Sequence, residues 1–282
     1  KEAETQQSVS IFKTKDEVSL KSITKTADTY KNMQSVKTNY EIGEGIKKIY
    51  NTTLTDFFVL ILIFIISTIL VTEEKDKNLF TIIKSTKNGN GKTLMAKIMT
   101  LFIGVFLICS LFYGTNYIYY LSTLGCGNIF ATIQSVPLLM LSTLKINILE
   151  YLFILFGAKV IFVFLLSMIM FYLSVKFNNT VENIFVFFII IIVNFIIFQS
   201  IDPTSSINLL KSFNLVSLLN TNEIFRIYDN LRLYNILVSK TSTLLILQII
   251  TIILFIILSF IKYLKNMNIT IRENVIWEKI KK

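Results

Sequence analysis

Polar residues that interrupt long apolar stretches are the first candidates for chemistry in this chain. Lys159 lies eleven residues into the stretch that begins at Ile148, and Asn194 and Gln199 lie in the next stretch. A charge at the centre of a bilayer costs roughly 2.5 kcal/mol or more, so such a residue is a functional candidate. A lysine stem reaches the interface from this depth, and we favour snorkelling or an interhelical pair over substrate contact for Lys159. Asn194 and Gln199 are candidates for interhelical hydrogen bonds or for a substrate pathway.

Several classes of catalytic chemistry are excluded or disfavoured by composition. Histidine is absent, which removes the usual zinc ligands, the commonest general base and the HExxH motif. Cys109 lies inside an apolar stretch and Cys126 after it, so their depths disfavour a disulfide. Residues 91–93 read Gly-Lys-Thr, but residue 86, where a phosphate-binding loop needs its first glycine, is Thr. We therefore expect no enzyme activity and no metal or cofactor bound by this chain.

Five apolar stretches position these residues, at 54–72, 94–121, 148–174, 183–201 and 242–261. At about 1.5 Å per residue, around 20 helical residues cover a hydrocarbon core of about 30 Å. Hydrophobic residues make up 53% of the 282 residues, and a soluble fold of this length lacks the cover for so many apolar runs. We predict an all-α polytopic membrane protein with five transmembrane helices in this chain.

The distribution of basic residues orients the spans. Five lysines lie between the first two stretches and six basic residues follow the last, whereas residues 122–147 carry only Lys145. We therefore place the segment 73–93 and the basic tail 262–282 in the cytoplasm, and residues 1–53, 122–147 and 202–241 outside. The chain begins at Lys1 without a methionine, so we expect an upstream signal peptide or, preferably, a sixth span.

The outer segments show helical spacing of apolar residues. We predict a helix over 20–36 and another from Glu44 into the first span, with a break at Gly43 and Gly45. Residues 8–12 are a candidate strand. The region 202–241 fits short amphipathic helices at or dipping into the outer interface, or an ordinary folded loop. An aromatic belt at headgroup level accounts for four tyrosines near the outer end of the second span, Tyr113, Tyr117, Tyr119 and Tyr120.

The segment directly after the first span has charges at its start and an apolar patch behind them. Residues 73–76 are Glu-Glu-Lys-Asp, and the patch contains Leu79, Phe80, Ile82 and Ile83. A short helix along the inner membrane face is one interpretation, and a cytosolic partner could push on such a helix. The ordinary basic flank of a membrane helix is the other.

This order of segments resembles the permease subunits of type-2 ABC exporters, more narrowly their Firmicute branch. Residues 73–80 are similar to an E-K-x-x-G-L-like stretch, and residues 84–92 to a K-S-T-K-x-G-R-G-K-like stretch. Residues 134–136, Gln-Ser-Val, are similar to a short I-Q-S element of that branch. The chain departs from the pattern at Asn78, where Gly is frequent, and at Asn90, where Arg is usual.

The resemblance implies a membrane-spanning subunit of an ATP-driven exporter in the bacterial plasma membrane. Its partners would be a cytosolic ATPase subunit that binds the ATP, a second permease subunit, identical or different, and membrane lipid, with no nucleic acid. The cargo would move outward, and peptides, antibiotics, lipids and polysaccharides all stay open. The implied coupling interface with the ATPase comprises Glu73, Glu74, Lys75, Asp76, Leu79 and Phe80.

A membrane receptor, sensor or immunity protein whose extracellular segment binds a ligand is the alternative from another class. Its output would need a partner, because about 20 residues follow Ile261 and no loop has room for an output domain. An intramembrane enzyme is disfavoured further, since no nucleophile and base recur at a shared depth.

Overall fold

The structure is a computed structural model of the whole chain. It describes residues 17–31, 33, 36, 38, 43–49, 53–77, 79, 82–83, 91–177, 180–200, 214–215, 218, 221–226, 228, 230–233 and 236–280. The strand predicted at 8–12, the glycine-rich run 84–90 and the first part of 202–241 lie outside the described residues. The described chain divides into two compact units, one of Lys1–Thr52, Asn116–Ala158 and Ile201–Leu247, and one of Thr53–Thr115, Lys159–Ser200 and Gln248–Lys282.

Among the described residues, five helices are long and apolar enough to cross a membrane, which confirms the five predicted spans. The first is α4, and the second runs through α6, the π-helix η2 and α7 without a break. The third to fifth are α8, α9 and α13, and α13 continues well beyond the predicted end at 261. Their bounds are α4 Thr53–Asp76, α6 Gly91–Cys109, η2 Ser110–Gly114, α7 Thr115–Thr123, α8 Ile148–Lys176, α9 Thr180–Ser200 and α13 Lys240–Ile280.

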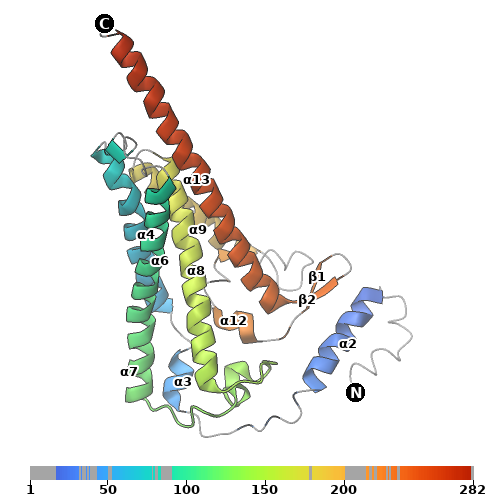
Figure 1. The fold of residues 1–282 in the computed structure, drawn as a ribbon. Coiled ribbons are helices and arrows are strands. Elements are labelled where there is room, and N and C mark those ends of the chain that lie inside the picture. Colours follow the sequence, from blue (N-terminus) through green and yellow to red (C-terminus); the bar gives the residue numbers. More distant parts are fainter. Residues whose placement is uncertain are drawn as a thin grey trace. The chain divides into compact units, whose positions relative to one another are not determined.

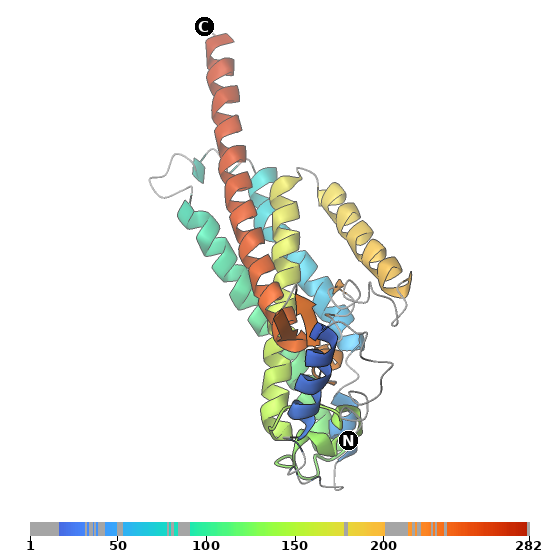
Figure 2. The same cartoon turned by 90° about the vertical axis from the view of Figure 1, so that its right-hand side faces the viewer.

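Aromatic and aliphatic side chains pack the helices of the second unit together. Phe64 of α4 stacks on Phe187 of α9, and Phe102 of α6 meets Phe164 of α8 edge to face. Met170, Leu173 and Phe187 form a buried cluster, and Phe64 of α4 packs against it. The rings of Tyr172 of α8 and Phe255 of α13 also meet edge to face. Figures 1 and 2 show the resulting arrangement of α4, α6, α8 and α13 as neighbours.

In the described part of the chain, the regular secondary structure is helical apart from one small hairpin, which the sequence interpretation missed. Strands β1 (Asn230–Leu233) and β2 (Ile236–Ser239) pair antiparallel, with Leu233 opposite Ile236. Two residues separate the strands, a length typical of tight hairpins, and the first strand alternates in polarity. Neither of the two alternatives given for 202–241, short amphipathic helices or an ordinary folded loop, included a hairpin. The short helix α12 (Thr221–Arg226) precedes it.

The predicted outer helices are present with different bounds. Helix α2 covers Glu17–Lys31, and α3 covers Glu44–Ile49. Gly45 lies within α3 and does not end a helix there. Its amide donates to the Gly125 carbonyl at 3.2 Å, and Gly125 has a φ of +80°, which favours glycine. A Cβ on Gly45 would lie 2.3 Å from the Tyr120 carbonyl oxygen, so the glycine permits a close backbone approach.

We expect Gly45→Ala to release α3 from the end of α7. The added methyl group would overlap backbone atoms that have no rotamer by which to move away. Hydrogen exchange should then become faster at the amides of residues 44–49. Gly157→Ala is the matched control, because nothing lies within 4 Å of the position of its Cβ. Equal exchange in the two variants would contradict the close approach.

Candidate functional site

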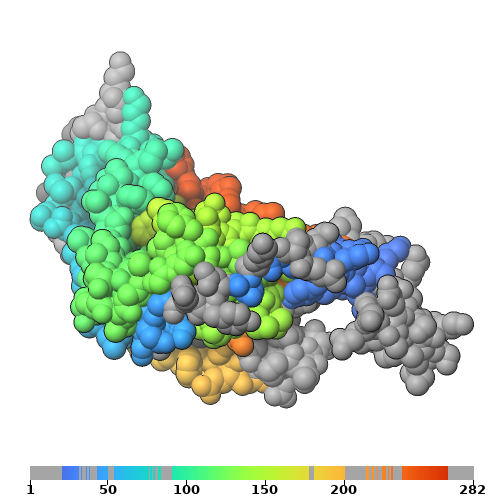
Figure 3. Space-filling model, turned by 90° about the horizontal axis from the view of Figure 1, so that it is seen from below, coloured from blue at the N-terminus to red at the C-terminus, as the bar shows by residue number. Residues whose placement is uncertain are grey.

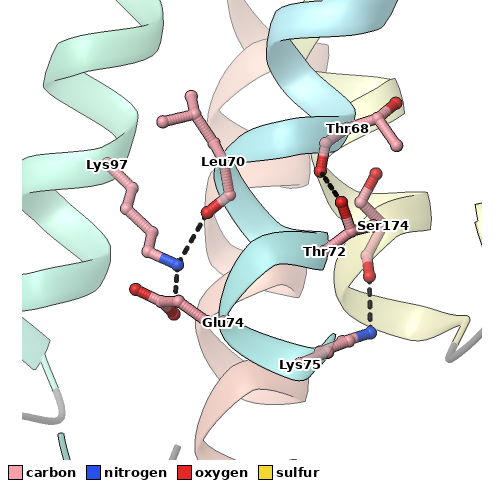
Figure 4. Close-up of polar contacts among 7 residues, drawn as sticks. All are labelled: Thr68, Leu70, Thr72, Glu74, Lys75, Lys97 and Ser174. Carbon is pink, nitrogen blue, oxygen red and sulfur yellow. Dashed lines mark hydrogen bonds and ion pairs between the residues drawn. The ribbon is translucent and has the colours of Figure 1, made fainter. Parts of the chain in front are cut away.

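The first candidate site is at the last turn of α4, and we call its residues Glu74, Lys75 and Lys97 the α4-end cluster. Glu74 forms an ion pair with Lys97, which lies in the second turn of α6. Lys97 Nζ also donates to the Leu70 carbonyl at 2.8 Å (Figure 4). Both side chains are largely buried, with 18% of Glu74 and 10% of Lys97 exposed. The pair therefore fixes the start of α6 against the end of α4.

Lys75 ties the same turn of α4 to the end of α8. Its Nζ donates to the Ser174 carbonyl at 2.6 Å (Figure 4). The same Nζ also donates to the Val175 carbonyl at 3.3 Å and to the Phe177 carbonyl. The last carbonyls of a helix have no partner within the helix and carry partial negative charge. An ammonium group donates hydrogen bonds to these carbonyls and compensates their partial negative charge. Lys75 thus caps the C-terminal end of α8.

Helix α13 also contacts the α4-end cluster. Lys97 Nζ lies 5.8 Å from the centroid of the Tyr263 ring, and 1% of Tyr263 is exposed. A Cβ built on Gly91, the first residue of α6, would lie 3.3 Å from Phe260 of α13. One turn of α4 therefore contacts α6 and α8 directly and reaches α13 through Lys97.

The residues predicted at the coupling interface do not form a separate helix at their start. Glu73 to Asp76 continue α4, so the charged run is the last turn of a span. Glu73 is 63% exposed, with Lys77 Nζ 3.9 Å from its carboxylate, whereas Glu74 and Lys75 are engaged within the bundle. Leu79 is half-buried and accepts a helical hydrogen bond from the Ile83 amide. Phe80 and the Asp76 side chain lie outside the described residues.

The second candidate site is a buried charge pair, and we call Asp56, Tyr113 and Lys159 the Asp56 cluster. Lys159 Nζ lies 2.7 and 2.8 Å from the two carboxylate oxygens of Asp56. Only 2% of the Lys159 side chain and 14% of the Asp56 side chain are exposed. Tyr113 is fully buried, donates its hydroxyl to Asp56 Oδ1 at 2.6 Å, and places its ring 5.3 Å from Lys159 Nζ. Lys159 of α8 therefore forms an interhelical ion pair with Asp56 of α4, which was one of the two interpretations favoured from the sequence.

The π-helix η2 contributes Tyr113 to this cluster. A π-turn adds one residue to a helical turn and rotates the side chains that follow, and such turns are frequent at functional sites. The aromatic belt was therefore the wrong interpretation for Tyr113. Tyr119, with 61% of its surface exposed, stays compatible with it.

The two other polar candidates lie on α9. Asn194 donates to the Ile190 carbonyl of its own helix at 2.8 Å, and Gln199 is exposed. Asp56 and Lys97 are site residues that the sequence interpretation missed. Lys97 and Glu74 carry opposite charges close to the two ends of one interhelical connection, and this signal was available in the sequence. Asp56 stands three residues from the start of a span, where a carboxylate looks interfacial.

Both clusters join helices through ion pairs, hydrogen bonds and contacts of an ammonium group with an aromatic ring. Within the described part of the chain, no group of three or more His, Cys, Asp or Glu residues is placed to hold a metal ion. Comparisons with protein-family models, with curated proteins and with solved structures find no match to this chain.

Proposed function

We propose that this chain is the membrane-spanning subunit of an ATP-driven exporter, in which the end of α4 receives force from a separate ATPase subunit. The observation that supports this most is the α4-end cluster. A single helical turn is bonded to α6 and to the end of α8, immediately before the connector that leads into α6. The motif resemblance of residues 73–80 and 84–92 supports the proposal, because it implies a coupling element in this part of the chain.

The mechanism follows from the way these contacts link the helices. Packed helices move as units, because repacking a dense interface costs more free energy than shifting a whole helix. A push on the exposed face of the last turn of α4, at Glu73, would move α4. Lys97 and Lys75 would carry α6 and α8 with it. ATP binding in the partner would thereby reorient the spans, while this chain itself binds no ATP.

The proposal assigns different roles to two adjacent glutamates. Glu73 is exposed and available to a partner, whereas Glu74 is committed to Lys97. We therefore expect Glu73→Lys to weaken docking of the ATPase or its coupling and to leave the membrane fold intact. A reversed charge at a docking surface slows association and opposes the bound state.

The experiment is co-expression with the product of the neighbouring reading frame, which the proposal expects to be a P-loop ATPase, followed by co-purification in mild detergent and ATP hydrolysis in proteoliposomes. Glu44→Lys is the matched control, since Glu44 is also an exposed glutamate paired with a lysine one turn away. Glu73→Lys should lose ATPase retention or substrate-stimulated hydrolysis, and Glu44→Lys should keep both. A wild-type chain that retains no ATPase, or that retains a kinase, would support the sensor alternative and defeat the export proposal.

A further inference from the structure

The connection between α7 and α8 has an unusual composition for a loop. No charged residue occurs between Lys97 and Lys145, so the charge-free sequence of the second span continues through almost the whole connection. The described residues 124–147 include two short 3-10 helices, η3 (Ile133–Ser135) and η4 (Pro137–Leu139). A segment surrounded by water normally carries charges, because water solvates them at no cost and they keep the protein soluble.

Large apolar side chains of this connection point outward. The exposed fraction is 72% for Phe130, 68% for Met140, 53% for Leu141 and 49% for Leu138. We call these four residues the connection patch. Figure 3 views the molecule from the side on which the residues of this connection, in green, gather at the surface beside α3. Contiguous exposed apolar surface marks contact with a protein partner, a ligand or a membrane.

The exposure of the patch is built into the fold of the connection. Gln134 is buried and donates to the Ser142 and Leu144 carbonyls at 3.0 and 2.7 Å. The Ile133 amide donates to the Ile146 carbonyl at 3.2 Å, and the Ile148 amide to the Ala131 carbonyl at 3.0 Å. Ile133, Val136 and Leu139 fill the interior of the connection. The patch side chains therefore have little buried apolar space to occupy while these hydrogen bonds are formed.

Two features of the connection favour lipid as the occupant of the patch. The connection is continuous at both ends with membrane spans, α7 ending at Thr123 and α8 beginning at Ile148. Tyr119, one turn before the end of α7, is exposed in the manner of a headgroup-level tyrosine. The connection therefore begins at the level of the membrane interface.

The hydrogen bonding of the connection also favours lipid as the occupant of the patch. A backbone enters the interface at low cost only when its amides and carbonyls are paired internally. Amides of Ala131, Ser135, Val136, Leu139 and Ser142 all donate to carbonyls within the connection. A protein-binding patch, by contrast, is normally rimmed by polar and charged residues, and the sequence from Ile98 to Leu144 has no charge with which to build such a rim.

We infer that the α7–α8 connection is an interfacial anchor, whose patch of Phe130, Leu138, Met140 and Leu141 is inserted between the headgroups and acyl chains of the adjacent leaflet. Amphipathic segments bind membranes in this way with the apolar face buried and the polar face in the headgroups. The anchor would hold the ends of α7 and α8 at a fixed depth. This inference depends only on the chain being embedded in a membrane and not on the export proposal.

The test is tryptophan fluorescence in vesicles. The chain has a single tryptophan, Trp277, so Trp277→Phe gives a background without tryptophan. Phe130→Trp and Met140→Trp then place the probe at two patch positions, where a large apolar side chain is already exposed and folding is preserved. Phe153→Trp on α8, 70% exposed within a span, is the lipid control, and Lys21→Trp on the polar helix α2 is the water control.

Each variant is reconstituted in phosphatidylglycerol and phosphatidylcholine vesicles with bromine on the acyl chains, either near the headgroup or near the chain end. We expect lipid brominated near the headgroup to quench the fluorescence of Phe130→Trp and Met140→Trp. The extent of this quenching should equal that of Phe153→Trp by either brominated lipid. Acrylamide in the water should quench Lys21→Trp and spare the patch positions. Patch tryptophans that acrylamide quenches and bromolipids do not would overturn the inference. Patch tryptophans protected from both quenchers would overturn it as well, in favour of a second copy or another protein.

Discussion

Replacing Asp56 by asparagine should destabilise this protein by about 3 kcal/mol, the largest effect that we expect from a single substitution. The change leaves the Lys159 ammonium buried, with 2% of its side chain exposed, and removes the carboxylate that lies 2.7 Å from it. Breaking a buried pair costs more than the pair contributes, because one charge then stays in a medium of low dielectric without compensation. Thermal unfolding in detergent, followed by the loss of helical signal, measures the effect.

The double variant Asp56→Asn/Lys159→Met makes this prediction sharper. It removes both charges, and the amide at position 56 still accepts the hydrogen bond from Tyr113. Replacing a buried ion pair by uncharged groups is often close to neutral, so the double variant should recover most of the lost stability. Asp28→Asn on the exposed face of α2 is the control and should change little. An Asp56→Asn protein as stable as this control would show that the pair is open to water.

Glu74→Lys should separate α6 from α4, the second large effect that we expect. The substitution brings two ammonium groups together at a site where both positions are largely buried, so the Coulomb energy changes from attraction to repulsion. We expect a loss of about 2 to 3 kcal/mol of stability and, under the export proposal, a loss of ATP hydrolysis coupled to transport. Thermal unfolding and the proteoliposome assay measure the two quantities independently.

Charge reversal at both positions distinguishes the internal role of Glu74 from a docking role. Glu74→Lys/Lys97→Glu restores opposite charges, although a carboxylate at position 97 no longer donates to the Leu70 carbonyl. Stability should therefore return in part, and coupling should return with it. Glu73→Lys, at the exposed neighbour, should impair coupling without loss of stability. If Lys97→Glu fails to rescue Glu74→Lys at all, the ion pair is not what joins α4 to α6.

The membrane spans were predictable because length and hydrophobicity are local properties of the sequence. Each apolar run has about the 20 residues that a helix needs to cross the hydrocarbon core, and no distant residue alters that requirement. The hairpin at 230–239 was not predicted, because its short strands carry the same apolar residues as a short helix. The two residues between its strands, Tyr234 and Asn235, are not one of the glycine-containing pairs that indicate a tight hairpin in a sequence.

The two clusters differ in how far the sequence determines them. Consecutive spans run in opposite directions, so Glu74 and Lys97, on either side of one connection, must lie at similar depth. The sequence alone thus brings the members of this pair close together, and the tertiary structure only adds that Lys75 caps α8.

The pairing of Asp56 with Lys159 was decided by the tertiary structure. Asp56 is the third residue of its span and Lys159 the twelfth, so helices that start at one level would hold them about 14 Å apart along the axis. Relative helix position removes that offset, and the π-turn at η2 brings Tyr113 to the same point. Hydrophobicity specifies that a helix crosses the membrane but not its vertical shift or rotation. Those depend on packing against neighbours, which is why the buried charge pair could not be found from the chain alone.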